Sequence, residues 1–600
     1  MLIVVTFSIL FMWLLVASAL IGIGSLLLGR LAAEYSLCDA FWAGLSVAIA
    51  AAQIYHFFRP IDVVFSALLF AVGLLGIALA RTALVRALLP ALGIGLWTTV
   101  SRVAVILAIA VRCSGPFLHY DTGFYGAMAV RWFTTYPIVP GLTNLLGQLG
   151  LNSSVFLGVA VLNQGPWHEA GYHLFVGLLL CALATRIVAS FTYVLRGTET
   201  PLDYFLLLFS MPGVVWAFNG ELVGTNTDLP TTIVSIMAVI LLFDALEKKR
   251  TPEGSERRIE SLLLTSLMLF TLAATFKISS LALCGIGWVM ATIQLLSNGS
   301  NAKRKRQLIL AALLLSGSVG IPWICRGAIL SGYPFYPSSA FALPVDWRVP
   351  RESADGLAQF NRSWARIPHA AFAETAGTRW LKPWFSGAIR NRIDFIIPAA
   401  VSFAGLIMLF SRKRKQNLYW LAVLVPSVGG LLFWFTLAPA FRFGESAIWI
   451  TAACLGTIAF QQMLPILNQV NKRAVVVGLL AIGGWCSYPR TLWRMSLEPS
   501  LRSHSFAALP AARVFPYVLS SGLAIRVPTY TNQCWDTTIP CSPNFSDNLK
   551  LRRETSLRWG FKIDGAPLPA GSDKFTPLHR RYIDSTPVVD VCANCHFQSK

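Results

Sequence analysis

Charged residues are scarce in this chain. They make up 13% of its 600 residues, whereas hydrophobic residues make up 55% and the mean hydropathy is +0.61. A soluble protein of this length carries about a quarter of charged residues, so the composition excludes an ordinary soluble fold. The chain also lacks an internal repeat of about 20 to 50 residues. We therefore predict an all-α polytopic integral membrane protein.

Acidic residues are scarcer than basic ones. The chain has 28 Asp and Glu residues against 49 Lys and Arg residues, which gives a net charge of +21. In a soluble chain this excess would suggest nucleic acid as a partner. Here the basic residues form short clusters between apolar runs, as in the cytoplasmic loops of membrane proteins, and we expect no nucleic-acid partner. The clusters are Lys248–Arg250 with Arg257–Arg258, Lys303–Arg306, Arg412–Lys415 and Lys472–Arg473.

Apolar runs of about 20 residues predict about fourteen transmembrane helices. An even number of runs separates the basic clusters, so all of the clusters can lie on the cytoplasmic side. The runs are near 2–28, 38–57, 61–80, 90–112, 168–192, 202–218, 231–245, 260–276, 279–297, 307–325, 395–411, 417–437, 445–466 and 474–490.

This topology divides the chain into four parts. Residues 1–112 form N-terminal transmembrane helices, 113–167 a first large outer loop, and 168–490 a transmembrane core. The core has further outer loops at 219–230, 326–394 and 438–444. Residues 491–600 form a small, irregular or mixed domain outside the cytoplasm.

Most of the eleven cysteines lie in apolar runs, where cysteine behaves as a small hydrophobic residue. Two pairs differ because they lie in the polar C-terminal part. Cys534 and Cys541 suit a disulfide that pins the outer domain. Cys592 to His596 spell CANCH, and Cys592, Cys595 and His596 fit the C-x-x-C-H pattern of haem attachment. Without an evident domain to enclose a haem, a local disulfide or a chance match is favoured there.

Residues 119–154 interrupt the apolar runs with many polar and aromatic side chains, too polar to cross a bilayer. We predict a re-entrant or surface-lying active-site segment on the outer face. A carboxylate at the hydrocarbon boundary costs several kcal/mol unless it is paired or used, so Asp121 is the catalytic candidate. Alternatively, Asp121 only caps the helix that starts there. The substrate-binding candidates of this segment are His119, Tyr120, Tyr125, Arg131 and Asn152.

His119 has further possible roles. It is a candidate second base or metal ligand, or only a hydrogen-bonded surface group. Asp228 lies in another outer loop, just before Pro230. If Asp228 meets Asp121, the two carboxylates could hold a divalent cation or divide the roles of base and orienting group. Otherwise Asp228 caps the helix that follows.

Three cations, Lys277, Arg326 and Arg442, lie at a similar depth near the outer face. Lys277 there either extends to the lipid headgroups or meets an anion. Cations that converge on one mouth would bind phosphate well. Tyr333 and Tyr336 in the large outer loop offer flat faces for sugar rings, although such residues also mark membrane interfaces generally.

Several short blocks resemble the signature blocks of a poorly characterised bacterial family of integral membrane proteins, over roughly residues 100 to 560. The blocks are YDTGFY at 120–125, RW at 131–132, YPIVPGLTNL at 136–145, LGLNSS at 149–154, SGYPFYP at 331–337, VDWRVP at 345–350, FRFG at 441–444 and QCWDTTIPC at 533–541. The order of features, with an aspartate opening the first long outer loop, also resembles the GT-C superfamily of membrane glycosyltransferases.

The second resemblance implies an enzyme in a bacterial cytoplasmic membrane. Asp121 matches the superfamily's first-loop aspartate, which acts as general base or metal ligand. The implied donor is a sugar on a polyprenyl phosphate, and the implied acceptor is a saccharide or a lipid. Two features depart from the superfamily pattern, because three runs precede the helix that leads to Asp121 and there is no Asp-Asp or Glu-x-Asp pair. A divalent metal is therefore left open.

We expect an inverting sugar transfer. Asp121 would deprotonate or orient the acceptor hydroxyl, and Lys277, Arg326 or Arg442 would hold the leaving phosphate. Two alternatives use the same basic mouth: a transporter or flippase for a lipid-linked saccharide, and a polymerase that joins two lipid-linked chains.

Overall fold

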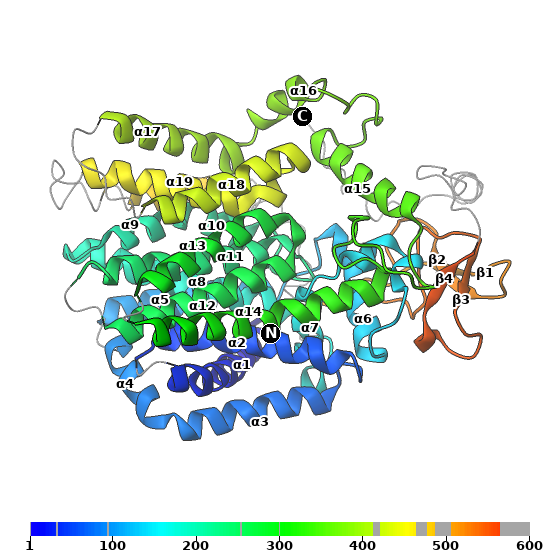
Figure 1. Cartoon of the computed structure of the whole chain (residues 1–600), viewed down its shortest axis with the longest axis horizontal. Helices are drawn as coiled ribbons and strands as arrows, with labels where there is room; N and C mark the ends of the chain where they lie inside the picture. Colours follow the sequence, from blue (N-terminus) through cyan, green and yellow to red (C-terminus); the bar gives the residue numbers. More distant parts are fainter. Residues whose placement is uncertain are drawn as a thin grey trace.

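The chain folds as a bundle of membrane-length helices with a small C-terminal region at one end (Figure 1). The computed structural model describes residues 2–31, 34–92, 95–251, 255–298, 301–411, 420–463, 474, 477–485 and 506–564. In these residues ten helices are long and apolar enough to cross a membrane. They are α1 (Leu2–Leu31), α2 (Leu37–His56), α5 (Leu96–Cys113), α8 (Gly171–Arg196), α9 with α10 (Pro201–Leu208 and Ser210–Phe218), α11 (Asp228–Lys248), α12 (Glu256–Phe276), α13 (Leu281–Asn298), α14 (Ala302–Ser331) and α19 (Phe441–Met463).

The remaining predicted spans are shorter or bent. α3 (Val63–Leu79) and α4 (Arg81–Leu92) meet at 78°, and α16 (Leu381–Ala388) meets the helix containing α17 (Ile397–Ser411) at 103°. If each bent pair is one span, the described residues hold up to twelve. α18 (Leu421–Leu437) has 17 residues, and the predicted run 474–490 lies largely outside the described residues. The chain is thus a mainly helical, multi-pass membrane protein, as predicted.

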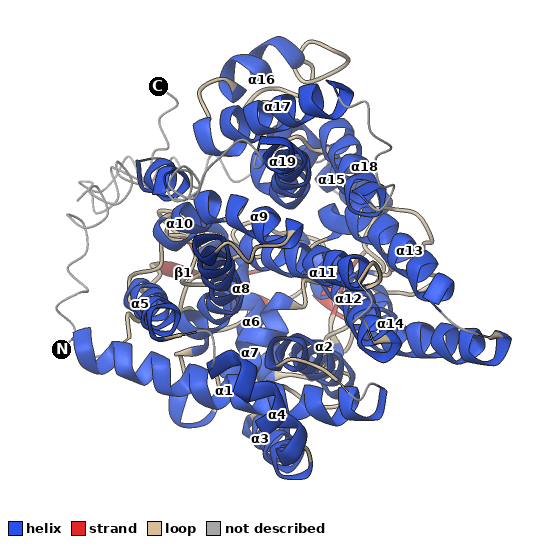
Figure 2. Cartoon of the chain, turned by 90° about the vertical axis from the view of Figure 1, so that its left-hand side faces the viewer, coloured by secondary structure: helices blue, strands red, loops and turns tan. Residues whose placement is uncertain are grey.

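Figure 2 shows the bundle with many of its helices seen nearly end on. α11 is almost completely buried and lies in the middle, while α1, α3 and α4 form one edge and α16 to α19 the other. Small residues allow close approach, since a Cβ on Gly24 or Gly44 would overlap the facing backbone of α2 or α1. Glycine at helix crossings is a common device in membranes, where burial alone does not drive association.

The two ends of the bundle differ in chemistry. The loop-rich end carries residues 114–167, 219–227 and 332–380, which include the short helices α6 (Ala127–Thr135), α7 (Val155–Leu162) and α15 (Arg351–Arg366). It lies on the right of Figure 1. α11 runs from this end to the opposite one, where α11 and α13 end and α12 and α14 begin. The predicted basic clusters Lys248–Arg250 with Arg257–Arg258 and Lys303–Arg306 therefore share the opposite end, while those at 412–415 and 472–473 lie outside the described residues.

The described C-terminal region packs beyond α6 and α7 at the loop-rich end (Figure 1). Its two antiparallel pairs are β1 (Val514–Val518) with β2 (Ala524–Pro528) and β3 (Leu549–Leu551) with β4 (Phe561–Ile563). The rest is irregular. A disulfide joins Cys534 to Cys541, the pair that the sequence suggested.

Candidate functional site

Asp121 stands where the connection from α5 enters a π-helical turn, Thr122–Gly126, that continues into α6. Its side chain makes no capping hydrogen bond to this turn, so the capping alternative is not what the structure shows. Instead, Asp121 Oδ2 accepts a hydrogen bond from Arg442 Nη1 at 3.2 Å. The Asp121 side chain is 22% exposed, which leaves it reachable from solvent.

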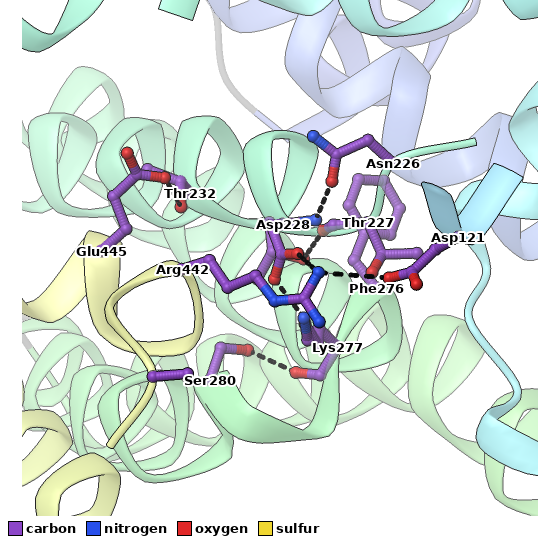
Figure 3. A network of polar contacts seen from close by, with 12 residues as sticks. Asp121, Asn226, Thr227, Asp228, Thr232, Phe276, Lys277, Ser280, Arg442 and Glu445 are labelled. Atoms are coloured by element: carbon purple, nitrogen blue, oxygen red, sulfur yellow. Dashed lines mark hydrogen bonds and ion pairs between the residues drawn. The ribbon is translucent and has the colours of Figure 1, made fainter. Parts of the chain in front are cut away.

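Arg442, the second residue of α19, links two carboxylates that are far apart in the sequence. Its Nη1 atom also lies 3.9 Å from Asp228 Oδ2, and Figure 3 shows the guanidinium extended between the two aspartates. The charged group lies over the rings of Trp364 and Phe443, at 4.9 and 5.0 Å. These aromatic faces stabilise a cation in this orientation without neutralising its charge.

Asp228 forms a second ion pair with Lys277. Asp228 is the first residue of α11, but its carboxylate does not cap that helix. It meets the Lys277 ammonium, which lies between α12 and α13 and over the Phe443 ring at 4.1 Å. Lys277 therefore meets an anion, one of the two outcomes predicted for it, and that anion is a carboxylate of the same chain. The four charges of Asp121, Asp228, Lys277 and Arg442 balance, as groups near hydrocarbon require.

A second set of polar residues lies next to the four charged groups and includes a hydrogen bond to the Asp228 backbone. Asn226 Oδ1 accepts a hydrogen bond from the Asp228 amide at 2.7 Å, and Asn226 Nδ2 donates to Glu221 Oε2 at 2.9 Å. Burial raises the pKa of the Glu221 carboxyl, an effect that the nearby His119 opposes and Asp228 reinforces. Glu445, one turn beyond Arg442 on α19, accepts hydrogen bonds from Trp216 and Thr232. Figure 3 shows Glu445 on the far side of Arg442 from Asp121.

The candidates predicted from the sequence did not include Asn226, Trp364 and Glu445. Glu445 carried a usable signal, because an acidic residue at the start of the predicted run 445–466 is costly next to hydrocarbon and marks a site by default. Asn226 and Trp364 carried none, since an amide in an outer loop and a tryptophan near a membrane interface are both common.

Three other candidates of the 119–154 segment lie close to Asp121 in sequence. Tyr125 is buried, and its burial, together with the Asp121 charge, raises the pKa of its hydroxyl. Tyr120 is 53% exposed and packs against Phe124. The Nδ1 atom of His119 is buried and has no hydrogen-bond partner among the described residues. These three side chains thus lie near the acidic part of the site, and their substrate roles stay predictions.

Arg326 does not join the other two cations. It is 1% exposed, its Nη1 faces Nδ1 of His56, and its guanidinium lies 4.9 Å from the centre of the Phe133 ring. His56 Nε2 faces the Tyr136 carbonyl oxygen at 3.1 Å and must donate there, so Nδ1 is left as the acceptor for Arg326. Arg326 therefore ties α14 to α2, and the predicted convergence holds only for Lys277 and Arg442.

The remaining candidates hold the loop-rich end together. Arg131 donates to the carbonyl oxygens of Asp536 and Thr537, and Asn152 exchanges hydrogen bonds with Trp323. Tyr333 and Tyr336 are 1% and 5% exposed. Neither ring offers an open face, because the chain around 345–357 folds over them. The Tyr333 hydroxyl donates a hydrogen bond to the Val349 carbonyl oxygen. The predicted sugar platform is therefore absent at these two positions.

The described residues also bear on the predicted metal. No group of three or more His, Cys, Asp or Glu side chains in them is arranged to hold a metal ion. Asp121 and Asp228 face a shared guanidinium, a poor setting for a second positive charge. The metal role of these two aspartates stays a prediction that this geometry does not favour. The C-x-x-C-H residues Cys592, Cys595 and His596 lie outside the described part of the chain.

Comparison with known families gives one result. Residues 7–449 match the model of a domain of unknown function, DUF8201. This range includes Asp121, Asp228, Lys277 and Arg442 and ends before the C-terminal strands. No curated protein and no solved structure matches the chain. Because the match spans well over half of the sequence, the chain belongs to the DUF8201 family.

Proposed function

We propose that this protein is a membrane glycosyltransferase of GT-C type, which moves a sugar from a polyprenyl-phosphate-linked donor to a saccharide or lipid acceptor. The observation that carries the proposal is the guanidinium of Arg442, shared by Asp121 and Asp228 at the loop-rich end of the bundle. A transfer of this kind needs a carboxylate base beside a cation that holds the leaving phosphate. Asp121 and Arg442 supply both groups, and their side chains are 22% and 37% exposed.

The unequal pairing of the two aspartates suggests how the base is activated. Asp228 has Lys277 as well as Arg442, whereas Arg442 is the ion partner seen for Asp121. A donor phosphate that binds Arg442 would draw it away from Asp121. At 3.2 Å the lost attraction is roughly 5 kcal/mol at an effective dielectric constant of ~20, and less here because Arg442 is more than a third exposed. The Asp121 carboxylate would then be free to contact the acceptor hydroxyl at the moment the donor is bound.

The reaction that follows is a single displacement at the anomeric carbon. The acceptor oxygen forms the new bond to this carbon from the face opposite the phosphate, and the bond from the carbon to the phosphate oxygen breaks. The acceptor proton goes to Asp121, and the bond electrons leave with the polyprenyl phosphate, whose charge Arg442 and Lys277 offset. The product therefore has inverted stereochemistry at this carbon.

We further propose that the site faces the outside of a bacterial cytoplasmic membrane. The basic clusters Lys248–Arg250 with Arg257–Arg258 and Lys303–Arg306 lie at the opposite end, as expected of cytoplasmic loops. The Cys534–Cys541 disulfide lies at the same end as the site and suits an oxidising compartment.

The decisive experiment is sugar transfer by the purified protein in nanodiscs, offered a panel of polyprenyl-phosphate sugars. Asp121→Asn should lower transfer by about 10² or more, the usual contribution of a general base, and still retain the donor lipid. Asp355→Asn removes a 53% exposed carboxylate from α15 at the same end and should leave transfer unchanged. Undiminished transfer by Asp121→Asn would end the proposal.

A transporter or flippase for lipid-linked saccharides is the second candidate. Glu445 favours it, because a carboxyl inside a span whose hydrogen bonds come from neutral Trp216 and Thr232 is suited to carry a proton. A transporter moves the lipid-linked saccharide without changing its mass, whereas a transferase shortens it by one sugar. Mass analysis of the lipid after incubation separates the two candidates, and also identifies a polymerase by a lengthened saccharide.

A further inference from the structure

The C-terminal region reaches back to the turn that carries Asp121. The amides of Cys534 and Trp535 both donate to the carbonyl oxygen of Gly123, at 2.8 and 3.2 Å. Gln533 Nε2 donates to the carbonyl oxygen of Tyr120 at 3.0 Å. Residues 533–541, which we name the disulfide loop, therefore contact the backbone on both sides of Asp121.

The fit between the two segments is close. The Trp535 ring lies directly against Gly123, where any Cβ would overlap it. Trp535 itself has a φ of 41°, a left-handed conformation that is strained for a bulky residue. Such a conformation persists only where the surroundings fix it, so the contact with Gly123 is specific.

The opposite side of the turn is held as well. The Thr225 amide donates to Thr122 Oγ1 at 3.1 Å. A Cβ on Gly126 would overlap Thr225, and one on Gly224, whose φ is 118°, would overlap Thr122. The π-helical turn thus lies between the loop that leads to Asp228 and the disulfide loop.

The disulfide connects this contact to the sheet. On one side of the bond, Cys541 bridges to Arg526 of β2, and the hydroxyl of Ser542 donates to the Leu145 carbonyl oxygen at 2.9 Å. On the other side, Cys534 holds Gly123. The bond therefore joins the residue that is hydrogen-bonded to the Asp121 turn to the residue that is paired with β2.

From these contacts we infer that the disulfide loop is a positioning element of the Asp121 site, with Trp535 as its positioning residue, and that the Cys534–Cys541 bond makes the site responsive to reduction. This inference rests on the proposed function for its catalytic consequence, but the structural coupling stands apart from it. Reduction by a dithiol transfers two electrons and two protons to the cysteines, which yields two thiols and the oxidised form of the dithiol. The loop then keeps its hydrogen bonds to Gly123 and to Arg526 of β2, but its two ends are no longer joined covalently.

Hydrogen–deuterium exchange of the full-length protein in nanodiscs, with and without dithiothreitol, tests the coupling directly. Reduction should speed exchange of the amides at 120–126 by about tenfold or more through local opening, and should leave those of α11 unchanged. Cys534→Ser with Cys541→Ser should show the faster exchange without dithiothreitol and no further response to it. Cys325→Ser, which removes an exposed free thiol, should behave as the unaltered protein.

Activity and rescue test the positioning role. Gly123→Ala should lower kcat about tenfold at a nearly constant KM for the donor, because it displaces the base rather than the phosphate site. Trp535→Ala should lower kcat in the same way, because the turn loses the ring that lies against Gly123, whereas Trp535→Phe keeps an aromatic ring there and should retain most of the activity. Unchanged exchange at 120–126, after mass spectrometry has shown that the disulfide is reduced, overturns the inference, as does a Trp535→Ala variant with an unchanged kcat. If exchange responds while Asp121→Asn keeps full transfer, the proposed function fails and the coupling stands.

Discussion

The Lys277–Asp228 pair gives the sharpest prediction for stability. Lys277→Met leaves the Asp228 carboxylate, 4% exposed, without its nearest cation. Removing one partner of a buried pair typically costs about 3 to 5 kcal/mol. Arg442 remains 3.9 Å away and still attracts Asp228 by about 4 kcal/mol at an effective dielectric constant of ~20, a value reduced by its exposure. We therefore expect a loss of about 2 to 3 kcal/mol, at or just below the usual range for a broken buried pair.

A double-mutant cycle isolates the pair. Asp228→Asn should also destabilise the protein, and the variant with both changes should lose at least about 1 kcal/mol less than the sum of the single losses. The free energy of unfolding is measured by sodium dodecyl sulfate titration in mixed micelles. Lys550→Met with Asp564→Asn, an exposed pair whose side chains are 39% and 54% exposed, is the matched control and should show no measurable coupling. Strictly additive losses for Lys277 and Asp228 would refute the reasoning.

Glu221, Arg326 and Asp346 can each be tested separately. Because burial raises the folded-state pKa of Glu221, its stabilising contribution is complete below the unfolded pKa of about 4.3 and is lost as the pH rises. Glu221→Gln should thus match the unaltered protein near pH 4 and exceed its unfolding free energy near pH 8; equal curves at both pH values would contradict this. Arg326→Met should change the rate of sugar transfer by no more than about threefold, because Arg326 contacts His56 and Phe133. A loss of about 10² would instead show that Arg326 takes part in phosphate binding. Hydrogen bonds from Arg552 lower the pKa of Asp346. The contact between Asp346 and Arg552 should therefore weaken as the pH falls through the folded-state pKa of Asp346. Proteolysis after residue 506 should then be faster in acid, and Asp346→Asn should show no such change.

The helices were predictable because each is an apolar run of membrane length, and that property depends on local sequence alone. Asp121 was predictable for a similar reason, since a carboxylate at the edge of hydrocarbon has to be paired or used. Its partner was not, because Arg442 lies 321 residues further along the chain. Only the packing of α19 against the loop-rich end decides which outer-face cation meets which acid.

The position of Arg326 along its helix was predictable, but the direction of its side chain was not. It shares the loop-rich end with Lys277 and Arg442, but α14 turns its side chain toward α2 and His56. Depth along a helix follows from sequence position, whereas direction follows from which face the neighbouring helices cover. The burial of Tyr333 and Tyr336 was unpredictable for a related reason, because it depends on how the following loop folds back over them.

We propose that Arg442 holds the phosphate of a polyprenyl-linked sugar beside Asp121, and the proposed function depends on this placement. Mass spectrometry of the lipids that copurify with the protein tests it most directly. We expect a polyprenyl-phosphate sugar bound to the unaltered protein and to Asp121→Asn, and its loss from Arg442→Gln. Equal retention by Arg442→Gln, or the absence of any polyprenyl phosphate from all three preparations, would contradict it.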